Sequence, residues 1–215
     1  MKWVEVDTQQ AYERIRKKII TLELAPGSLI NEQRLSEELE LGTTPVREAL
    51  KLLIHDDLVF ITERHGLYVA DINIPDLEQL SEMRISLESF CARLAALRAD
   101  SDDLHVFEAL QLEQARTPSE NSHLLLDLDH KFHKALVRAA RNKYLTRSLN
   151  HFFDLSQRLW YVAIPHIDFL SASVAEHLDL VEALKKKDAD RTEQIMRNHV
   201  KGFYDRVRVV LEEKG

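Results

Sequence analysis

The stretch that decides the fold is NEQRLSEELELGTTPVREALKLLIHDDLV, residues 31–59. Asn31 is a good helix cap, and apolar residues at helical spacing follow it as far as Leu39. A second helix starts at the Thr-Pro dipeptide of residues 44–45, because proline suits a first helical turn, and it ends near Asp56. Two short helices joined by a tight turn predict a helix-turn-helix motif.

Regular patterns on both sides of this motif complete a small domain. Upstream, residues 8–22 place their apolar side chains on one stripe, which predicts an amphipathic helix. Downstream, the runs LVFIT (58–62) and LYVADI (67–72) are rich in β-branched and aromatic residues, and the break between them contains a glycine. Three helices and a hairpin predict a winged helix-turn-helix domain over residues 1–72.

The rest of the chain, residues 73–215, has helical periodicity throughout. The sequence NIPD at residues 73–76 is a natural boundary, because proline favours an extended residue before it and a first helical turn at its own position. Apolar residues then recur at spacings of three and four in six segments, near 76–98, 102–116, 122–140, 143–162, 171–187 and 189–212. The predicted fold is therefore mostly α, a winged helix-turn-helix followed by an all-helical bundle.

Composition and charge narrow the function classes. The chain has 215 residues and a formal net charge of −7, which argues against a protein that coats nucleic acid through bulk electrostatics. Residues 1–72 alone hold nine Lys/Arg against thirteen Asp/Glu, so specific DNA binding would need a local basic face. No apolar run is long enough for a membrane span or a signal peptide, and Cys91 has no second cysteine to pair with, so we expect a cytoplasmic protein.

Four polar residues of the helical domain lie on faces that should be apolar. Asp129 and His133 are four apart and share one helix face, while His177 and His199 each lie on the apolar stripe of a later helix. Taken singly, each histidine is explained as a hydrogen-bonded core residue. Together, buried groups that all need partners are explained by a shared divalent metal ion. An Asp oxygen and three imidazoles suit Zn²⁺ best among the candidates, with Ni²⁺ and Mn²⁺ as alternatives.

The N-terminal domain resembles the GntR group of transcription regulators. The residues that carry the resemblance are the Pro26-Gly27 turn, Leu35-Ser36, the run TPVREAL at 44–50, and His65-Gly66. In such a domain the second helix of the motif enters the major groove of double-stranded operator DNA. The resemblance implies that Thr43, Thr44 and Arg47 face DNA and that Gln33, Arg34, His65 and Gly66 touch the backbone or minor groove.

Arg47 is the best candidate for a base contact, because a guanidinium can donate two hydrogen bonds to guanine O6 and N7. One departure from the family pattern concerns the residues before the Thr-Pro dipeptide. Where the family commonly has Ser-Arg, this chain has Gly42-Thr43. Glycine caps a helix only slightly less well than serine, so the fold should survive while affinity or preferred sequence differs.

The C-terminal domain resembles the FCD effector domain of one GntR subgroup. Its marks are DHKFH at 129–133, AEH at 175–177 and MRNH at 196–199. In metal-binding members of that subgroup the ligands fall at positions that match Asp129, His133, His177 and His199. Members also use an arginine matching Arg84 to grip the carboxylate of a small organic-acid effector. The other interpretation of Arg84 is an ion pair with Glu88, one turn later.

Asn142 is a weaker candidate for the effector pocket, and the remaining histidines form no coherent set: His55, His105, His123, His130, His151 and His166. The sequence therefore predicts a ligand-responsive DNA-binding regulator, not an enzyme, that works as a homodimer on two-fold operators. Two alternatives stay open. One is a metal-dependent hydrolase with a helical-bundle site, and the other is a partner-binding protein that has lost DNA recognition.

Overall fold

The computed structural model describes residues 2–62 and 66–212. The chain folds into two compact units: the first ends at Asn73 and also takes in Gln157–Tyr161, and the second begins at Ile74. Within the described ranges, no helix is both long enough and apolar enough to cross a membrane.

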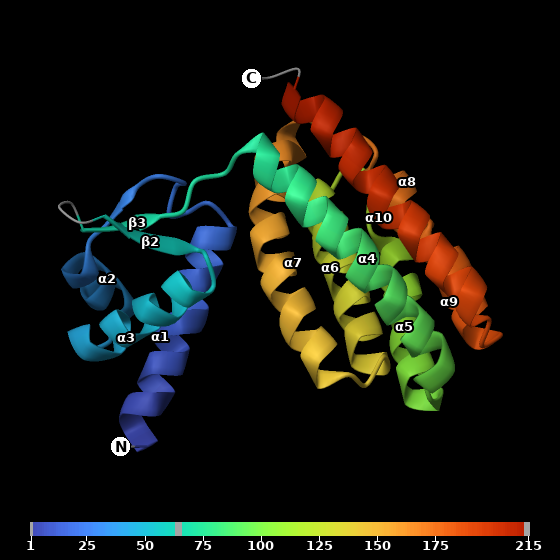
Figure 1. Ribbon diagram of the computed structural model, residues 1–215, viewed down its shortest axis with the longest axis horizontal. Coiled ribbons are helices and arrows are strands. Elements are labelled where there is room, and N and C mark those ends of the chain that lie inside the picture. Colours follow the sequence, from blue (N-terminus) through green and yellow to red (C-terminus); the bar gives the residue numbers. More distant parts are fainter. Residues whose placement is uncertain (1, 63–65, 213–215) are drawn as a thin grey trace. The chain divides into compact units, whose positions relative to one another are not determined.

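The first unit is a winged helix-turn-helix, as the sequence predicts (Figure 1). Its described residues form three helices and three short strands: α1 (Lys2–Ile20), β1 (Leu29–Ile30), α2 (Glu32–Leu39), α3 (Thr43–His55), β2 (Val59–Thr62) and β3 (Gly66–Val69). The strands form an antiparallel sheet in the order β1-β3-β2. Helix α1 packs on α3, and Ala11, Ile15 and Ile19 are fully buried there. The stripe predicted for residues 8–22 is therefore the core face.

Local chemistry sets the helix boundaries of the motif. The Asn31 side chain accepts a hydrogen bond from the Arg34 backbone N–H at 2.9 Å, so Asn31 caps α2 as predicted. Gly42 occupies the corresponding position before α3 and supplies no side-chain cap. Gly27 has a φ of +70°, and a Cβ there would lie 2.7 Å from Asp71 Oδ1, so the turn before β1 requires glycine.

The second unit is an all-helical bundle (Figure 1). Its elements are α4 (Ile74–Arg98), α5 (Ser101–Arg116), α6 (Ser122–Ala139), α7 (Lys143–Ala163), the 3₁₀ turn η1 (Ile164–His166), α8 (Leu170–Ala175), α9 (His177–Lys185) and α10 (Ala189–Glu212). Helix α4 packs along α10 and against α6. A capping box between Asp100 and Asp103 begins α5, and Asn121 caps α6.

The structure corrects two predicted elements. The single helix predicted near 171–187 is two helices, because the Glu176 N–H bonds the Ser173 carbonyl in a tighter turn at 3.1 Å and α9 restarts at His177. The predicted strand 67–72 ends at Val69. Beyond it, the Ala70 N–H bonds to the Leu58 carbonyl at 3.0 Å before the chain leaves the sheet.

Candidate metal centre and DNA-reading surface

The four predicted metal ligands converge in the interior of the helical unit. Helix α6 supplies Asp129 and His133, α9 supplies His177 and α10 supplies His199; they are only 7%, 3%, 2% and 3% exposed. The Nε2 atom of His199 lies 3.3 Å from the Nε2 atoms of both other histidines. The four ligand atoms all lie within 4.8 Å of one another. Residues up to seventy positions apart in sequence thus form one cluster.

Two glutamates fix the orientation of two of these rings. Glu88 of α4 contacts Nδ1 of His133, and Oε2 of Glu176 lies 2.8 Å from Nδ1 of His199. An ionised carboxylate only accepts hydrogen bonds, so each Nδ1 carries the donated proton. In a neutral imidazole this leaves Nε2 as a lone-pair acceptor, and the two acceptors then face each other. Such a carboxylate–histidine arrangement typically orients metal-ligating histidines.

The pKa shifts of Asp129 and His133 favour the charged form of each side chain, so the buried carboxylates of the cluster have to be balanced by positive charge. Burial lowers the pKa of His133, but Glu88 and Asp129 outweigh it and raise this pKa to about 9. Burial would raise the pKa of Asp129, yet the three histidines hold it well below its usual value. Burial lowers the pKa of His177 to about 4, so this ring stays neutral. Without a metal, protons on the other histidines have to balance the carboxylates.

Asp129 gives the sharpest test of whether the residues fit a metal. Its buried Oδ1 atom makes no hydrogen bond among the described residues. The three Nε2 atoms lie 3.4, 3.6 and 3.7 Å from it, too far for good hydrogen bonds. Bonds of about 2.0–2.2 Å to zinc would place neighbouring ligand atoms about 3.3–3.6 Å apart in a tetrahedron. The Nε2–Nε2 and Nε2–Oδ1 distances given above, 3.3–3.7 Å, are close to this spacing, and all four ligand atoms lie within 4.8 Å of one another, so this donor set could hold one cation.

The His177 ring is held by packing. It stacks on Phe132 with ring centroids 3.9 Å apart and an interplanar angle of 4°. Because α9 restarts at His177, this ring lies at a helix start beside Glu176, which serves His199 instead. Sequence reasoning missed this role of Glu176, since neither helical face nor spacing shows which residue of α10 it meets.

Arg84 is buried beside the cluster and linked to it through Glu88. Its Nε donates to Glu88 Oε1 at 2.6 Å, so the predicted ion pair is confirmed. Its guanidinium also lies over the rings of Phe153, at 5.0 Å, and Tyr204, at 5.6 Å. Although burial would raise the pKa of Glu88, Arg84 and His133 lower it to about 2. The effector role of Arg84 stays a prediction.

Asn142 and His130 lie in environments that differ from those expected from the sequence. The Asn142 side chain accepts the backbone N–H groups of Tyr144 and Leu145, so it caps the start of α7, and these contacts give it a structural part. His130, expected to be incidental, is half-buried and packs edge-on against Phe153 at 5.7 Å, and burial lowers its pKa to about 3. It is not one of the four converging ligands.

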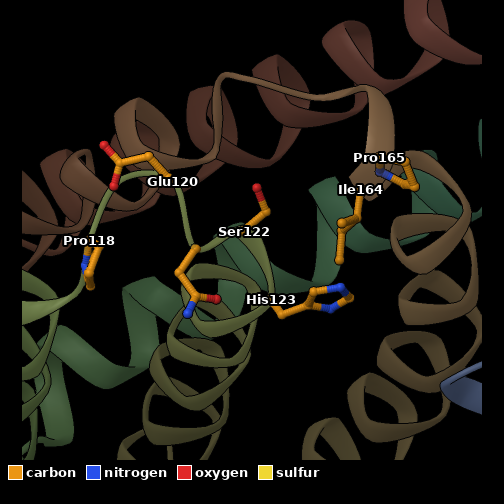
Figure 2. A pocket seen from close by; sticks show the side chains of 7 residues that line it. Pro118, Glu120, Ser122, His123, Ile164 and Pro165 are labelled. Atoms are coloured by element: carbon orange, nitrogen blue, oxygen red, sulfur yellow. The ribbon is translucent and has the colours of Figure 1, made fainter.

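A pocket in this unit lies at the surface. Its volume is about 460 Å³. Figure 2 shows that its lining residues lie between the start of α6 and η1. Its lining includes Pro118, Glu120 and His123, all exposed. None of the predicted metal, effector or DNA-binding residues lines it.

The predicted DNA-reading residues share the surface of the helix-turn-helix. Gln33 and Arg34 on α2, Thr43, Thr44 and Arg47 on α3, and Gly66 at the start of β3 are all exposed, as DNA contact requires. The seventh, His65, lies outside the described residues. Arg47 is not isolated, because its Nε donates to Glu32 Oε2 of α2 at 2.9 Å.

Comparison with known proteins identifies the two units. Residues 7–69 match the bacterial regulatory proteins of the gntR family, and residues 79–202 match the FCD domain. The chain belongs to the GntR family and carries an FCD domain. This GntR regulator is therefore a DNA-binding transcription regulator and not an enzyme, which sets aside the hydrolase alternative. GntR regulators bind operator DNA and effector ligands, typically as dimers.

Relatives match this GntR regulator over nearly its full length. The HTH-type transcriptional repressor RspR of Escherichia coli K12 is 28% identical over 207 residues, covering 95% of this chain and 90% of that protein. The uncharacterized HTH-type transcriptional regulator YdhC of Bacillus subtilis 168 is 28% identical over 207 residues, with coverage of 95% and 92%. Among solved structures, E. coli McbR/YncC has a TM-score of 0.81 at 19% identity, with coverage of 97% and 99%, and shares the fold.

Proposed function

We propose that this GntR regulator senses a small organic acid through a divalent metal ion held by Asp129, His133, His177 and His199. One observation carries the proposal: three imidazole Nε2 atoms and the unsatisfied Asp129 Oδ1 face one another in the apolar interior of the FCD domain. Zinc is our first choice for the metal, with nickel or manganese as alternatives. A bound metal supplies a Lewis-acid centre that attracts a carboxylate oxygen.

Arg84 is the residue we assign to the carboxylate of the effector. It is 5% exposed and lies one ion pair away from the metal cluster, since Glu88 contacts both Arg84 and His133. A guanidinium binds a carboxylate through two parallel hydrogen bonds, which a lysine does not reproduce. We propose that the effector meets both this guanidinium and the metal. Binding there would change the contacts between α4, α6 and α10.

Metal analysis of the purified protein, followed by a thermal-shift screen of small carboxylates, tests this function. We expect close to one divalent ion per chain and a Tm increase with particular carboxylates that disappears when a chelator has removed the metal. Monocarboxylates that chelate metals weakly are the informative ligands, because a strong chelator would strip the site. Protein without metal that also gains no stability from added zinc, nickel or manganese would contradict the proposal.

For the DNA half, we propose that α3 enters the major groove and that Arg47 reads a guanine. The exposure of Arg47 and its position in the second turn of α3 support this role. An Arg47→Ala variant should lose specific operator affinity while its FCD domain still takes up metal. Equal affinity of the variant and the original protein for a selected operator would show that Arg47 makes no base contact.

We propose that two copies of this chain form a homodimer through α4. The helix exposes Met83, Phe90 and Leu97, which are 45%, 46% and 56% exposed and seven positions apart, so they lie along one face. In an antiparallel two-fold pair centred on Phe90, Met83 of one copy meets Leu97 of the other. The exposed Glu82 then meets Arg98, which gives the pair complementary charges.

A further inference from the structure

The ion pair between α2 and α3 bears on how the DNA-reading arginine is presented. Arg47 Nε donates to Glu32 Oε2 at 2.9 Å, and the two side chains are 59% and 29% exposed. Three other acidic residues of α2 and α3 contact different side chains: Glu37 accepts from Gln33 at 2.9 Å, Glu38 pairs with Lys18 at 2.6 Å, and Glu48 pairs with Lys51 at 2.7 Å. Glu32 is thus the carboxylate that contacts Arg47.

The contact selects which nitrogens of Arg47 remain available to a base. A guanidinium offers two pairs of parallel donors: Nε with one Nη, or the two Nη atoms at its tip. Because Nε already donates to Glu32, the tip pair is the one left to meet guanine O6 and N7. The ion pair also restricts a long side chain that would otherwise lose much rotamer freedom on binding.

We propose that Glu32 is a specificity-determining positioning residue, which orients Arg47 so that its two Nη atoms read one guanine in each half-site. The inference rests on the proposed role of Arg47 in base reading. The negative charge of Glu32 has a second effect, on the affinity for DNA phosphates. A carboxylate on this surface repels phosphates, so it weakens binding to all DNA sequences, whereas the oriented fork strengthens binding to the correct one. The repulsion lowers specific and non-specific affinity alike, so the orientation of Arg47 is what raises the ratio of specific to non-specific affinity.

A selection from a random double-stranded DNA library tests this with the full chain. Five proteins are compared: the original chain, Glu32→Gln, Glu48→Gln, Arg47→Ala and the Glu32→Gln/Arg47→Ala double variant. Glu48→Gln is the matched control, since it removes the same charge from α3 without touching the contact to Arg47. The readouts are the base preference at each position of the selected site and the affinity for non-specific DNA at fixed salt.

The original chain should prefer guanine at one position of each half-site by about 5- to 150-fold, the range of a good bidentate contact. Glu32→Gln should lower that preference at least about threefold while binding non-specific DNA more tightly. Glu48→Gln should tighten non-specific binding and keep the preference. In an Arg47→Ala background, Glu32→Gln should change the preference no further, because the two residues act through one contact.

The outcomes separate this inference from the function on which it rests. If Arg47→Ala abolishes the guanine preference while Glu32→Gln changes base preference no more than Glu48→Gln does, the role of Glu32 is wrong and that of Arg47 stands. If Arg47→Ala leaves the preference intact, both roles are wrong. Thermal unfolding of each variant establishes that it is folded, which is expected because both glutamates are surface residues.

Discussion

Replacing His199 with alanine should abolish metal-dependent stabilisation of this GntR regulator. His199 is the central ligand of the cluster, because its Nε2 lies 3.3 Å from each of the other two imidazole Nε2 atoms and 3.7 Å from Asp129 Oδ1. The variant also deprives Glu176 of its 2.8 Å contact. Losing one of four ligands and the orientation of its neighbours should cost more metal affinity than the 10- to 100-fold typical of outer-shell changes.

The size of the expected effect follows from mass action. A metal present at 100 times its Kd stabilises the folded state by about 2.7 kcal/mol. In a chain of this length each 1 kcal/mol corresponds to about 2–4 °C in Tm, so a chelator should lower the Tm of the original protein by about 5–11 °C. The same chelator should leave the Tm of His199→Ala nearly unchanged. Differential scanning calorimetry and metal content per chain are the measurements.

His130→Ala is the control for this experiment. His130 follows Asp129 directly but packs on Phe153, so the variant should lose some packing and some absolute stability. Its chelator-dependent drop in Tm and its metal content should nevertheless equal those of the original protein. If His199→Ala shows the same chelator-dependent drop as the original protein, with equal metal content, the four-residue site is refuted.

Three further predictions concern pH, the effector and assembly. Without metal, the raised pKa of His133, about 9, adds to the free energy of unfolding; this contribution is complete below the unfolded pKa of 6.5 and is lost as pH rises toward 9. The pKa of His177 is lowered to about 4, so the free energy of unfolding also falls as pH drops from 6.5 toward 4. The Tm of chelator-treated protein should therefore peak near pH 6.5, and a Tm that rises steadily to pH 9 would contradict this. Arg84→Lys should keep metal content while weakening carboxylate binding at least about tenfold by calorimetric titration, and unchanged affinity would exclude a bidentate grip. Phe90→Glu should convert dimers to monomers in analytical ultracentrifugation, because it places like charges together at the two-fold axis, whereas a variant that remains dimeric would place the interface elsewhere.

Periodicity predicted the positions of most helices of the FCD domain well. Asp100 and Asn121 are side-chain caps, so the starts of α5 and α6 can be recognised from local sequence. The four candidate ligands could be recognised for a related reason, since a polar residue on an apolar helix face has few explanations. The break at Glu176 was not predictable, because apolar residues continue at helical spacing through it. Strand β1 was missed because two residues show no alternation.

Side-chain contacts between different helices could not be predicted from the sequence, for a different reason. Glu176 reaches His199, and Glu32 reaches Arg47, across gaps of 23 and 15 positions. Whether such pairs meet depends on the relative rotation and crossing of two helices, which the pattern of one helix does not determine. The Arg84–Glu88 pair was predictable by contrast, since residues four apart on a single helix are neighbours by geometry alone.

The candidate metal cluster and the proposed DNA contact use carboxylates in the same way, and this changes how the acidic composition is understood. Glu88 and Glu176 engage Nδ1 of a histidine and thereby turn Nε2 toward the cluster, as Glu32 engages Nε of Arg47 and leaves the two Nη atoms. The excess of acidic over basic residues in residues 1–72 therefore does not by itself argue against operator recognition. It lowers affinity for DNA of any sequence, but the biologically relevant quantity is the ratio of specific to non-specific binding, and that ratio rises when a carboxylate orients the base-reading arginine.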